Sequence, residues 1–231
     1  TKPVRIVVPY PAGGFNDTLG RLAAKYLSDY WKKPVIVDNK PGAGTMIGTK
    51  EVAGAAADGH TILVVQFPYA ANPGLYKNIA YDTQKAFAPV LLAGRSPMLL
   101  VTHAQGPYRS AAELLAAARI KPNALTYGSS GAGSSNHLAM ALFETATATQ
   151  MRQIPYKGST PMLTDLAGGQ FDVALDLLPH AMPFMQSGRV HPLAIAAPKR
   201  SPLLPDVPTA AEAGIPGYEV SSWHGFVVPS G

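Results

Sequence analysis

The chain has 231 residues, of which 47% are hydrophobic and 14% are charged, and its formal net charge is +5. No apolar run in the sequence approaches the roughly 18 residues needed to span a bilayer, and the lack of cysteine excludes disulfides, thiol catalysis and cysteine-based zinc sites. The cationic residues are scattered rather than gathered in one Lys/Arg run, which argues against a nucleic-acid partner.

Strand-like and helix-like segments alternate along the first part of the chain. The apolar runs at 4–8, 34–38 and 61–65 predict strands, and the segments between them, 17–31 and 45–56, have helical spacing. This order is typical of a parallel sheet covered by helices. We therefore expect an α/β fold. We expect it to have two lobes, each of which is a mostly parallel sheet flanked by helices.

The alternation restarts near residue 97. The expected elements of this second series are strand 97–103, helix 110–120, strand 124–128, a helix from about 135, strand 151–156, helix 159–167, and strands 171–176 and 191–197. We expect residues 86–97 to cross between two lobes and residues 218–229 to return. The predicted domains are 1–96 (the N-terminal part of lobe 1), 97–219 (lobe 2) and 220–231 (the return to lobe 1).

The loop after the first strand, in "IVVPYPAGGFND" (6–17), suggests a ligand site. Pro9 and Pro11 stiffen it, whereas Gly13 and Gly14 allow positive φ and let a ligand approach the main chain closely. Asn16 or Asp17 is the expected N-cap of the next helix. Because a helix start presents unpaired N–H groups, such a loop can hold phosphate, sulfate or carboxylate.

Three further loops have the same character: "NKPGAGTMIG" (39–48), "YGSSGAGSSNH" (127–137) and "PYKGSTP" (155–161). All are rich in small residues and precede helices. Open α/β sheets bind ligands beyond the carboxyl ends of their strands, so the four loops together predict a site for an anion.

The chain resembles the Bug family of periplasmic solute-binding proteins, also called the TctC family. The segments that carry the resemblance cover nearly the whole chain and include "PVRIVVPYPAGGFNDTLGRLAAKYL", "LTYGSSGAGSSNHLAMALF", "IPYKGSTPMLTDLAGGQFDVALD" and "KRSPLLPDVPTAAEAGIPGYEVSSWHGFVVP". The resemblance implies a two-lobed Venus-flytrap receptor. Such a receptor binds a small carboxylate (an organic, amino or aromatic acid) in the cleft between its lobes and delivers it to a tripartite tricarboxylate transporter.

The resemblance also implies the site residues. Ligand contacts are expected from Tyr10, Ala12, Gly13, Gly14, Phe15, Asn16, Asp17 and Gln66 in the first lobe, and from Ser129, Ser130, Gly131, Ser134, Ser135, Asn136, His137, Tyr156, Lys157, Gly158 and Asp176 in the second. We expect no metal, no cofactor and no catalytic residue. The expected protein is a periplasmic monomer in its mature form, without its signal peptide and without direct membrane insertion, whose partners are the transporter's membrane subunits.

Two departures from the family pattern bear on the ligand. "VQFPYAANP" replaces small residues after the third strand, so Gln66, Phe67 and Tyr69 are expected to narrow the pocket, and Leu177 stands where relatives commonly have Asn. The chain ends at Gly231, where family members continue for several dozen residues that complete the first lobe. We also expect Gly14→Val to weaken binding more than Lys157→Ala, because backbone N–H groups are expected to hold the anion.

The alternatives rest on weaker patterns. "GAGTMIG" (42–48) is one residue away from a dinucleotide fingerprint, but the next strand ends in Gln66 rather than in an acidic residue. "GSSGAGSS" lacks the G-x-S-x-G of a hydrolase, and His137 beside it is more simply a structural histidine. A dinucleotide-dependent α/β enzyme is the second interpretation, and a structural or interaction module is the third.

Overall fold

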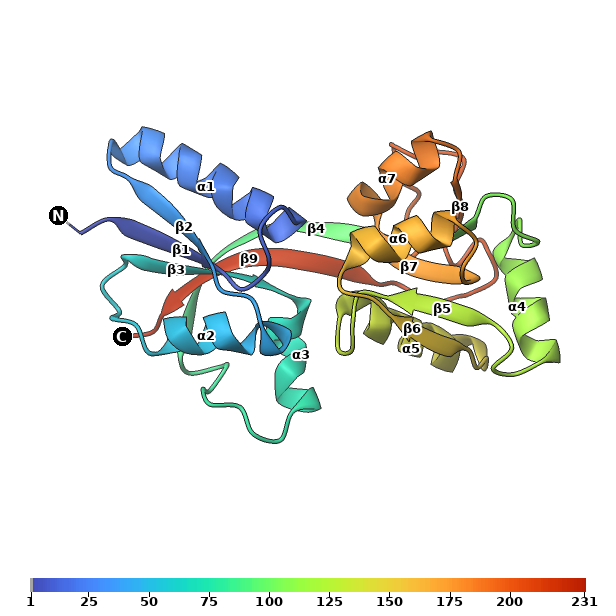
Figure 1. Ribbon diagram of the computed structural model, residues 1–231, viewed down its shortest axis with the longest axis horizontal. Helices are drawn as coiled ribbons and strands as arrows, with labels where there is room; N and C mark the ends of the chain where they lie inside the picture. The colour runs from blue at the N-terminus through green and yellow to red at the C-terminus, as the bar shows by residue number, and fades with distance from the viewer. Residues whose placement is uncertain (1) are drawn as a thin grey trace. The chain divides into compact units, whose positions relative to one another are not determined.

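The computed structural model describes residues 2–231, which form two compact units. Among these residues, unit 1 comprises 2–94 and Trp223–Gly231, and unit 2 comprises Arg95–Ser222. Two strands, β4 (Phe87–His103) and β9 (Ser221–Pro229), are hydrogen-bonded neighbours and run from one unit into the other (Figure 1). None of the helices in this described part combines the length and the apolar character that a bilayer crossing requires.

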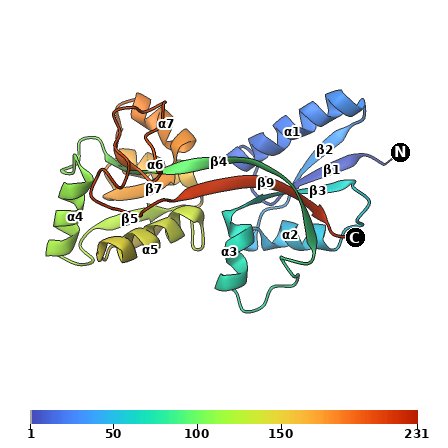
Figure 2. The same cartoon turned by 180° about the vertical axis from the view of Figure 1, so that it is seen from behind.

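The sheet of unit 1 has the strand order β2-β1-β3-β9. β1 (Val4–Val8) pairs in parallel with both β2 (Val35–Asn39) and β3 (Thr61–Gln66), whereas β9 is antiparallel to β3. The helices of this unit are α1 (Phe15–Trp31), α2 (Met46–Ala53), preceded by the short 3₁₀ helix η1 (Ala43–Thr45), and α3 (Phe67–Leu75). In Figures 1 and 2, α1 covers one face of the sheet and α2 covers the other.

Successive residues of β1 point to opposite faces of the sheet, and both faces are covered, which explains why Ile6, Val7 and Val8 are all apolar. Ile6 and Val8 pack in the cluster that includes Ala24 of α1, while Val7 packs in the cluster that includes Val52 of α2. α1 approaches closely because Gly20 faces the sheet: a Cβ there would lie 2.7 Å from Val8 Cγ2. The end of β1, from which the first predicted ligand loop starts, is therefore fixed from both sides.

Unit 2 has the strand order β4-β7-β5-β6, with β8 on β4. β5 (Thr126–Ser129) is parallel to β6 (Arg152–Pro155) and β7 (Val173–Leu177), whereas β4 is antiparallel to β7 and β8 (Val190–Ile195). Its helices are α4 (Ala111–Ile120), α5 (Ser135–Thr147), α6 (Ser159–Ala167) and α7 (Leu178–Gln186).

Two clusters fill the core of unit 2, one on each face of its sheet. Leu114, Met140 and Phe143 belong to the cluster of α4 and α5, and Leu163 and Leu166 to the cluster of α6 and α7. These side chains are essentially inaccessible to solvent. The burial of both faces accounts for the apolar character of β7, all five residues of which are buried.

The predicted α/β class and most predicted strands are confirmed, with three corrections. The sheets are mixed, because the crossing strands β4 and β9 and the late strand β8 join them antiparallel. Helices α3 and α7 were not predicted, since each carries proline at its start and a second proline inside. The strand predicted at 97–103 begins earlier than expected, because it continues unbroken through the crossing segment as Phe87–His103.

Candidate functional site

The loop after β1 is shaped at Gly13, whose φ of 87° is positive, whereas Gly14 has an extended backbone with φ −84°. Gly14 is the residue that precedes α1, so the prediction of Asn16 or Asp17 as N-cap is wrong. The physical reason is that glycine can take the N-cap conformation without a side chain, and α1 then begins two residues earlier than expected. Of these two glycines, Gly13 alone uses the positive φ that glycine allows.

Asp17 holds this loop from inside the helix. Its Oδ2 accepts hydrogen bonds from Gly13 N (2.9 Å) and from Arg21 Nε (2.9 Å), and its Oδ1 accepts one from Asn39 Nδ2 (2.9 Å). The Arg21 guanidinium, helped by the Gly13 N–H and the Asn39 amide and opposed by burial, lowers the pKa of Asp17 to about 2. One backbone donor predicted for a ligand is therefore already used by the protein's own carboxylate.

Behind the loop, three polar side chains from distant segments meet in the interior of unit 1. Asn16 Nδ2 donates to Gln66 Oε1 (3.2 Å), and His224 Nδ1 lies 2.9 Å from Asn16 Oδ1. The Phe15 ring, 37% exposed, lies 4.5 Å from the His224 ring. Of these, His224 was not foreseen, because it is 208 residues from Asn16 in sequence and reaches the site on β9.

The remaining first-lobe candidates are Tyr10 and Ala12. Tyr10 packs partly buried against the cluster of Ile6 and Val8, and burial raises the pKa of its hydroxyl above the ordinary value. Ala12 is exposed. All eight first-lobe candidates thus come from two segments, the 10–17 loop and the end of β3.

In unit 2 the loop between β5 and α5 is organised around Asn136, which is 1% exposed. Its Oδ1 accepts from Ser130 N (3.2 Å) and Ser130 Oγ (2.7 Å). Ser134 is the N-cap of α5, and its Oγ accepts from His137 N (3.4 Å) and donates to Gly131 O (2.6 Å). The loop therefore has one defined shape, with φ of 121° at Gly131.

His137 and Ser129 have structural partners. His137 Nδ1 accepts from Gly133 N (3.1 Å), so its neutral ring carries the proton on Nε2. Ser129 is fully buried, and its Oγ accepts from Gln153 Nε2 (2.7 Å). Because Ser129 is buried and His137 Nδ1 already accepts a hydrogen bond, these two residues do not form a nucleophile–base pair. Ser135 lies partly exposed in the first turn of α5.

The turn after β6 brings three more candidates beside this loop. Tyr156 N donates to Ser129 O (2.8 Å), and burial, followed by the hydrogen bond and charge of Asp165, raises the pKa of Tyr156 to about 12. Lys157 is exposed. Gly158, with φ 114°, precedes α6, and among the described residues no heavy atom lies within 4 Å of a Cβ built on it.

Asp176 is the last candidate, 1% exposed and next to the start of α7. Its Oδ1 accepts from Leu177 N (2.7 Å) and Ser159 Oγ (3.1 Å) and lies 3.3 Å from His180 Nδ1. Burial lowers the pKa of His180, but the hydrogen bond and charge of Asp176 outweigh it, so the pKa is raised above its ordinary value. This carboxylate is therefore hydrogen-bonded to the side chain of the first residue of α6 and to the backbone N–H of the residue before α7.

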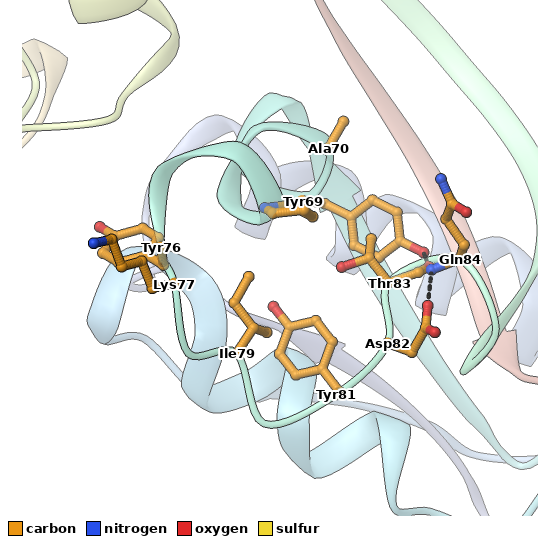
Figure 3. Close-up of a pocket in the computed structure, with 10 residues that line it drawn as sticks. Tyr69, Ala70, Tyr76, Lys77, Ile79, Tyr81, Asp82, Thr83 and Gln84 are labelled. Atoms are coloured by element: carbon orange, nitrogen blue, oxygen red, sulfur yellow. Dashed lines mark hydrogen bonds between the residues drawn. The ribbon is translucent and has the colours of Figure 1, made fainter.

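A separate cavity of about 770 Å³ lies in unit 1, between α3 and the segment that leads to β4 (Figure 3). Tyr69, which was expected to narrow the ligand site, is among the residues that line this cavity. Its ring packs edge-on against Phe87, and its hydroxyl donates to Thr83 O (2.8 Å). None of the predicted ligand residues is among those that line this cavity.

The glycines of the 42–48 segment have a packing role. A Cβ on Gly48 would lie 2.9 Å from Lys40 O, so the helix start approaches the preceding loop closely. Gly42 and Gly44 have positive φ around η1. These roles account for the glycine pattern without a dinucleotide.

The sequence model that describes the tripartite tricarboxylate transporter family receptor, TctC, matches residues 19–231. The chain belongs to the TctC family. A protein of Pseudomonas sp. (strain P51), described as a UPF0065 protein in the tcbD-tcbE intergenic region, is 38% identical over 100% of this chain and 69% of its own length.

Solved structures agree with this TctC assignment. The R. palustris protein Rpa4515 with adipate is 39% identical with a TM-score of 0.88, and the periplasmic binding protein BugD is 35% identical with a TM-score of 0.87. MatC from Rhodopseudomonas palustris with bound malate is 34% identical with a TM-score of 0.88. Each match covers 99% of this chain and 77% or 78% of the other. The predicted family and the two-lobed periplasmic-binding-protein fold are thereby confirmed.

Proposed function

We propose that this TctC-family protein is a periplasmic receptor that binds a small carboxylate with loops from both units and passes it to the membrane subunits of a tripartite tricarboxylate transporter. Units 1 and 2 serve as its two lobes, and the ligand shifts the population toward a closed state because it contacts both. Family membership and the adipate and malate in two relatives at 39% and 34% identity support the carboxylate class.

The observation that carries this proposal is the α5 start. α5 has no acidic residue in its first turn, and its N-cap is the neutral Ser134. The starts of α1 and α6, by contrast, have Asp17 and Asp176 beside them. The partial positive charge of a helix start therefore remains available at α5, where Ser130, Ser135 and the glycine backbone supply neutral contacts.

We further propose that the protein is no enzyme and works as a monomer without a cofactor. The start of α5 offers neutral hydroxyls and backbone donors, which suit reversible binding. A simple measurement decides this point: ligand incubated with a catalytic amount of purified protein should be recovered unchanged.

Isothermal calorimetry tests the ligand class. Adipate and malate are titrated first, then other dicarboxylates, amino acids and aromatic acids, with NAD as the competitor from the alternative interpretation. We expect at least one small carboxylate to bind and NAD not to bind. Binding of NAD in preference to every carboxylate would instead favour the dinucleotide enzyme.

Paired glycine variants test the first-lobe loop. Gly13 (φ 87°) and Gly59 (φ 76°) both have positive φ in unit 1, and a Cβ on either would have no described heavy atom within 4 Å. Valine strains both positions alike. We expect Gly13→Val to lower carboxylate affinity at least tenfold and Gly59→Val to leave it unchanged; equal affinity in the two variants would remove this loop from the site.

A further inference from the structure

The outward face of α1 carries three large side chains in one row. Leu22, Tyr26 and Tyr30 are 65%, 69% and 74% exposed. Their spacing of four residues places them on one side of the helix, opposite Gly20 and Ala24, which face the sheet. The Tyr26 and Tyr30 rings stack, with centroids 6.4 Å apart and planes 5° apart. We call Leu22, Tyr26 and Tyr30 the α1 stripe.

Three exposed lysines lie close in sequence to the α1 stripe. Lys25 lies in the middle turn of the helix, and Lys32 and Lys33 follow its last turn; all three are exposed. Arg21 is paired with Asp17 (2.9 Å). Asp29, also exposed, is the negative residue next to the α1 stripe. The face therefore combines tyrosine rings with an excess of lysine ammonium groups.

We propose that the α1 stripe and its lysines dock the protein on an anionic phospholipid surface. Tyrosine places an apolar ring and a polar hydroxyl at the boundary of a membrane, and lysine extends its apolar stem while its charge meets lipid headgroups. Three exposed lysines against one exposed aspartate give this end of α1 a net positive charge, which complements anionic lipid headgroups. Charge complementarity thus selects the lipid surface as the partner.

The docking is weak and reversible. A lysine near an anionic membrane contributes about fivefold in partitioning, a figure that corresponds to about 1 kcal/mol. Three lysines together increase partitioning about a hundredfold, and the negative charge of Asp29 reduces this increase. The attraction falls with salt because the charges are exposed. Docking of this kind would concentrate a receptor at the membrane without inserting any helix.

The experiment measures co-sedimentation of the full chain with vesicles of phosphatidylglycerol and phosphatidylethanolamine, with phosphatidylcholine vesicles as the neutral reference. We expect binding to the anionic vesicles at low ionic strength and its loss near 1 M salt, where screening is nearly complete. Lys25→Gln, Lys32→Gln and Lys33→Gln combined should lower partitioning about a hundredfold. The matched control combines Lys77→Gln, Lys85→Gln and Lys199→Gln, which removes the same charge from exposed sites elsewhere.

Two further variants separate the rings from the charge. Asp29→Asn should raise partitioning about fivefold, and Tyr26→Ser with Tyr30→Ser should lower it with no change in net charge. Unchanged carboxylate affinity in every variant keeps this inference independent of the receptor function.

Three outcomes overturn the inference. The first is no binding to anionic vesicles at low salt, and the second is an equal loss in the two lysine combinations, which would indicate nonspecific charge attraction. The third is a dimer in solution that Tyr26→Ser and Tyr30→Ser dissociate, which would assign the α1 stripe to a second copy.

Discussion

Replacing Asp17 by Asn should destabilise unit 1 by between about 1 and 2 kcal/mol at neutral pH. The pKa of Asp17 falls from 3.8 to about 2, which corresponds to about 2 kcal/mol of preference for the ionised form. The Asp17 side chain is only 5% exposed, but its partner Arg21 is 56% exposed, so solvent screening reduces the figure. Asn keeps the shape but turns one acceptor into an NH₂ donor that faces other donors.

The sign of the pH dependence follows from the lowered pKa. Because Asp17 binds its proton less readily when folded, its stabilisation is present above the unfolded pKa of about 4 and is lost as the pH falls toward 2. Urea unfolding at pH 7 and at pH 3 should therefore separate the wild type and Asp17→Asn at pH 7 and bring them closer at pH 3. Equal stability at pH 7, or a gap that stays constant down to pH 3, would refute this account of the loop.

Two further expectations concern unit 2. His180 should titrate above its ordinary pKa in an NMR pH series, so its stabilisation of the fold is present below about 6.5 and is lost as the pH rises through the folded pKa. Asp176→Asn should lower that pKa, because burial then disfavours the charged ring without the opposing hydrogen bond and charge of Asp176, and an unchanged pKa would rule out Asp176 as the cause. Gly128→Ala should lower the free energy of unfolding by about 1 to 3 kcal/mol, because the added Cβ would lie 2.8 Å from Met162 Cγ and still closer to the Phe171 ring. The control Gly74→Ala, whose Cβ would meet no described atom within 4 Å, should leave the stability unchanged, and equal melting temperatures of the two variants would contradict this account of the packing.

The strands were predictable because burial on both faces requires consecutive apolar residues, as at 6–8 in β1 and at 173–175 in β7. Helices α3 and α7 were not predicted because Pro68 and Pro179 at their starts are typical of loops. Proline nevertheless fits the first turn of a helix. The length of β4 was missed because Pro89 and Gly94 interrupt its pattern.

The sequence predicted which loops are candidates for the site, but it did not predict which hydrogen bonds their polar groups form. Gly13 and Gly14 are equivalent in sequence, and only the helix start at Phe15 distinguishes their backbone conformations. Asn39 and His224 form hydrogen bonds with residues of the 10–17 segment from other strands, and the sequence around either residue does not predict that contact. Side-chain partners separated by many residues depend on strand order and register, which a single sequence does not specify.

The protein's own carboxylates suggest a final test of where a ligand anion binds. Asp17 and Asp176 already accept hydrogen bonds at the starts of α1, α6 and α7, whereas α5 has no acidic residue in its first turn. Ser135→Asp would place a carboxylate there, which should stabilise α5 by about 0.3 to 1 kcal/mol through the helix dipole. The same charge should repel a ligand carboxylate and weaken its binding at least tenfold, so the melting temperature and the affinity should move in opposite senses. Ser135→Asn, of the same shape but neutral, should change neither by much. Full affinity in Ser135→Asp, measured by calorimetry with whichever carboxylate binds the wild type, would place the ligand away from the start of α5.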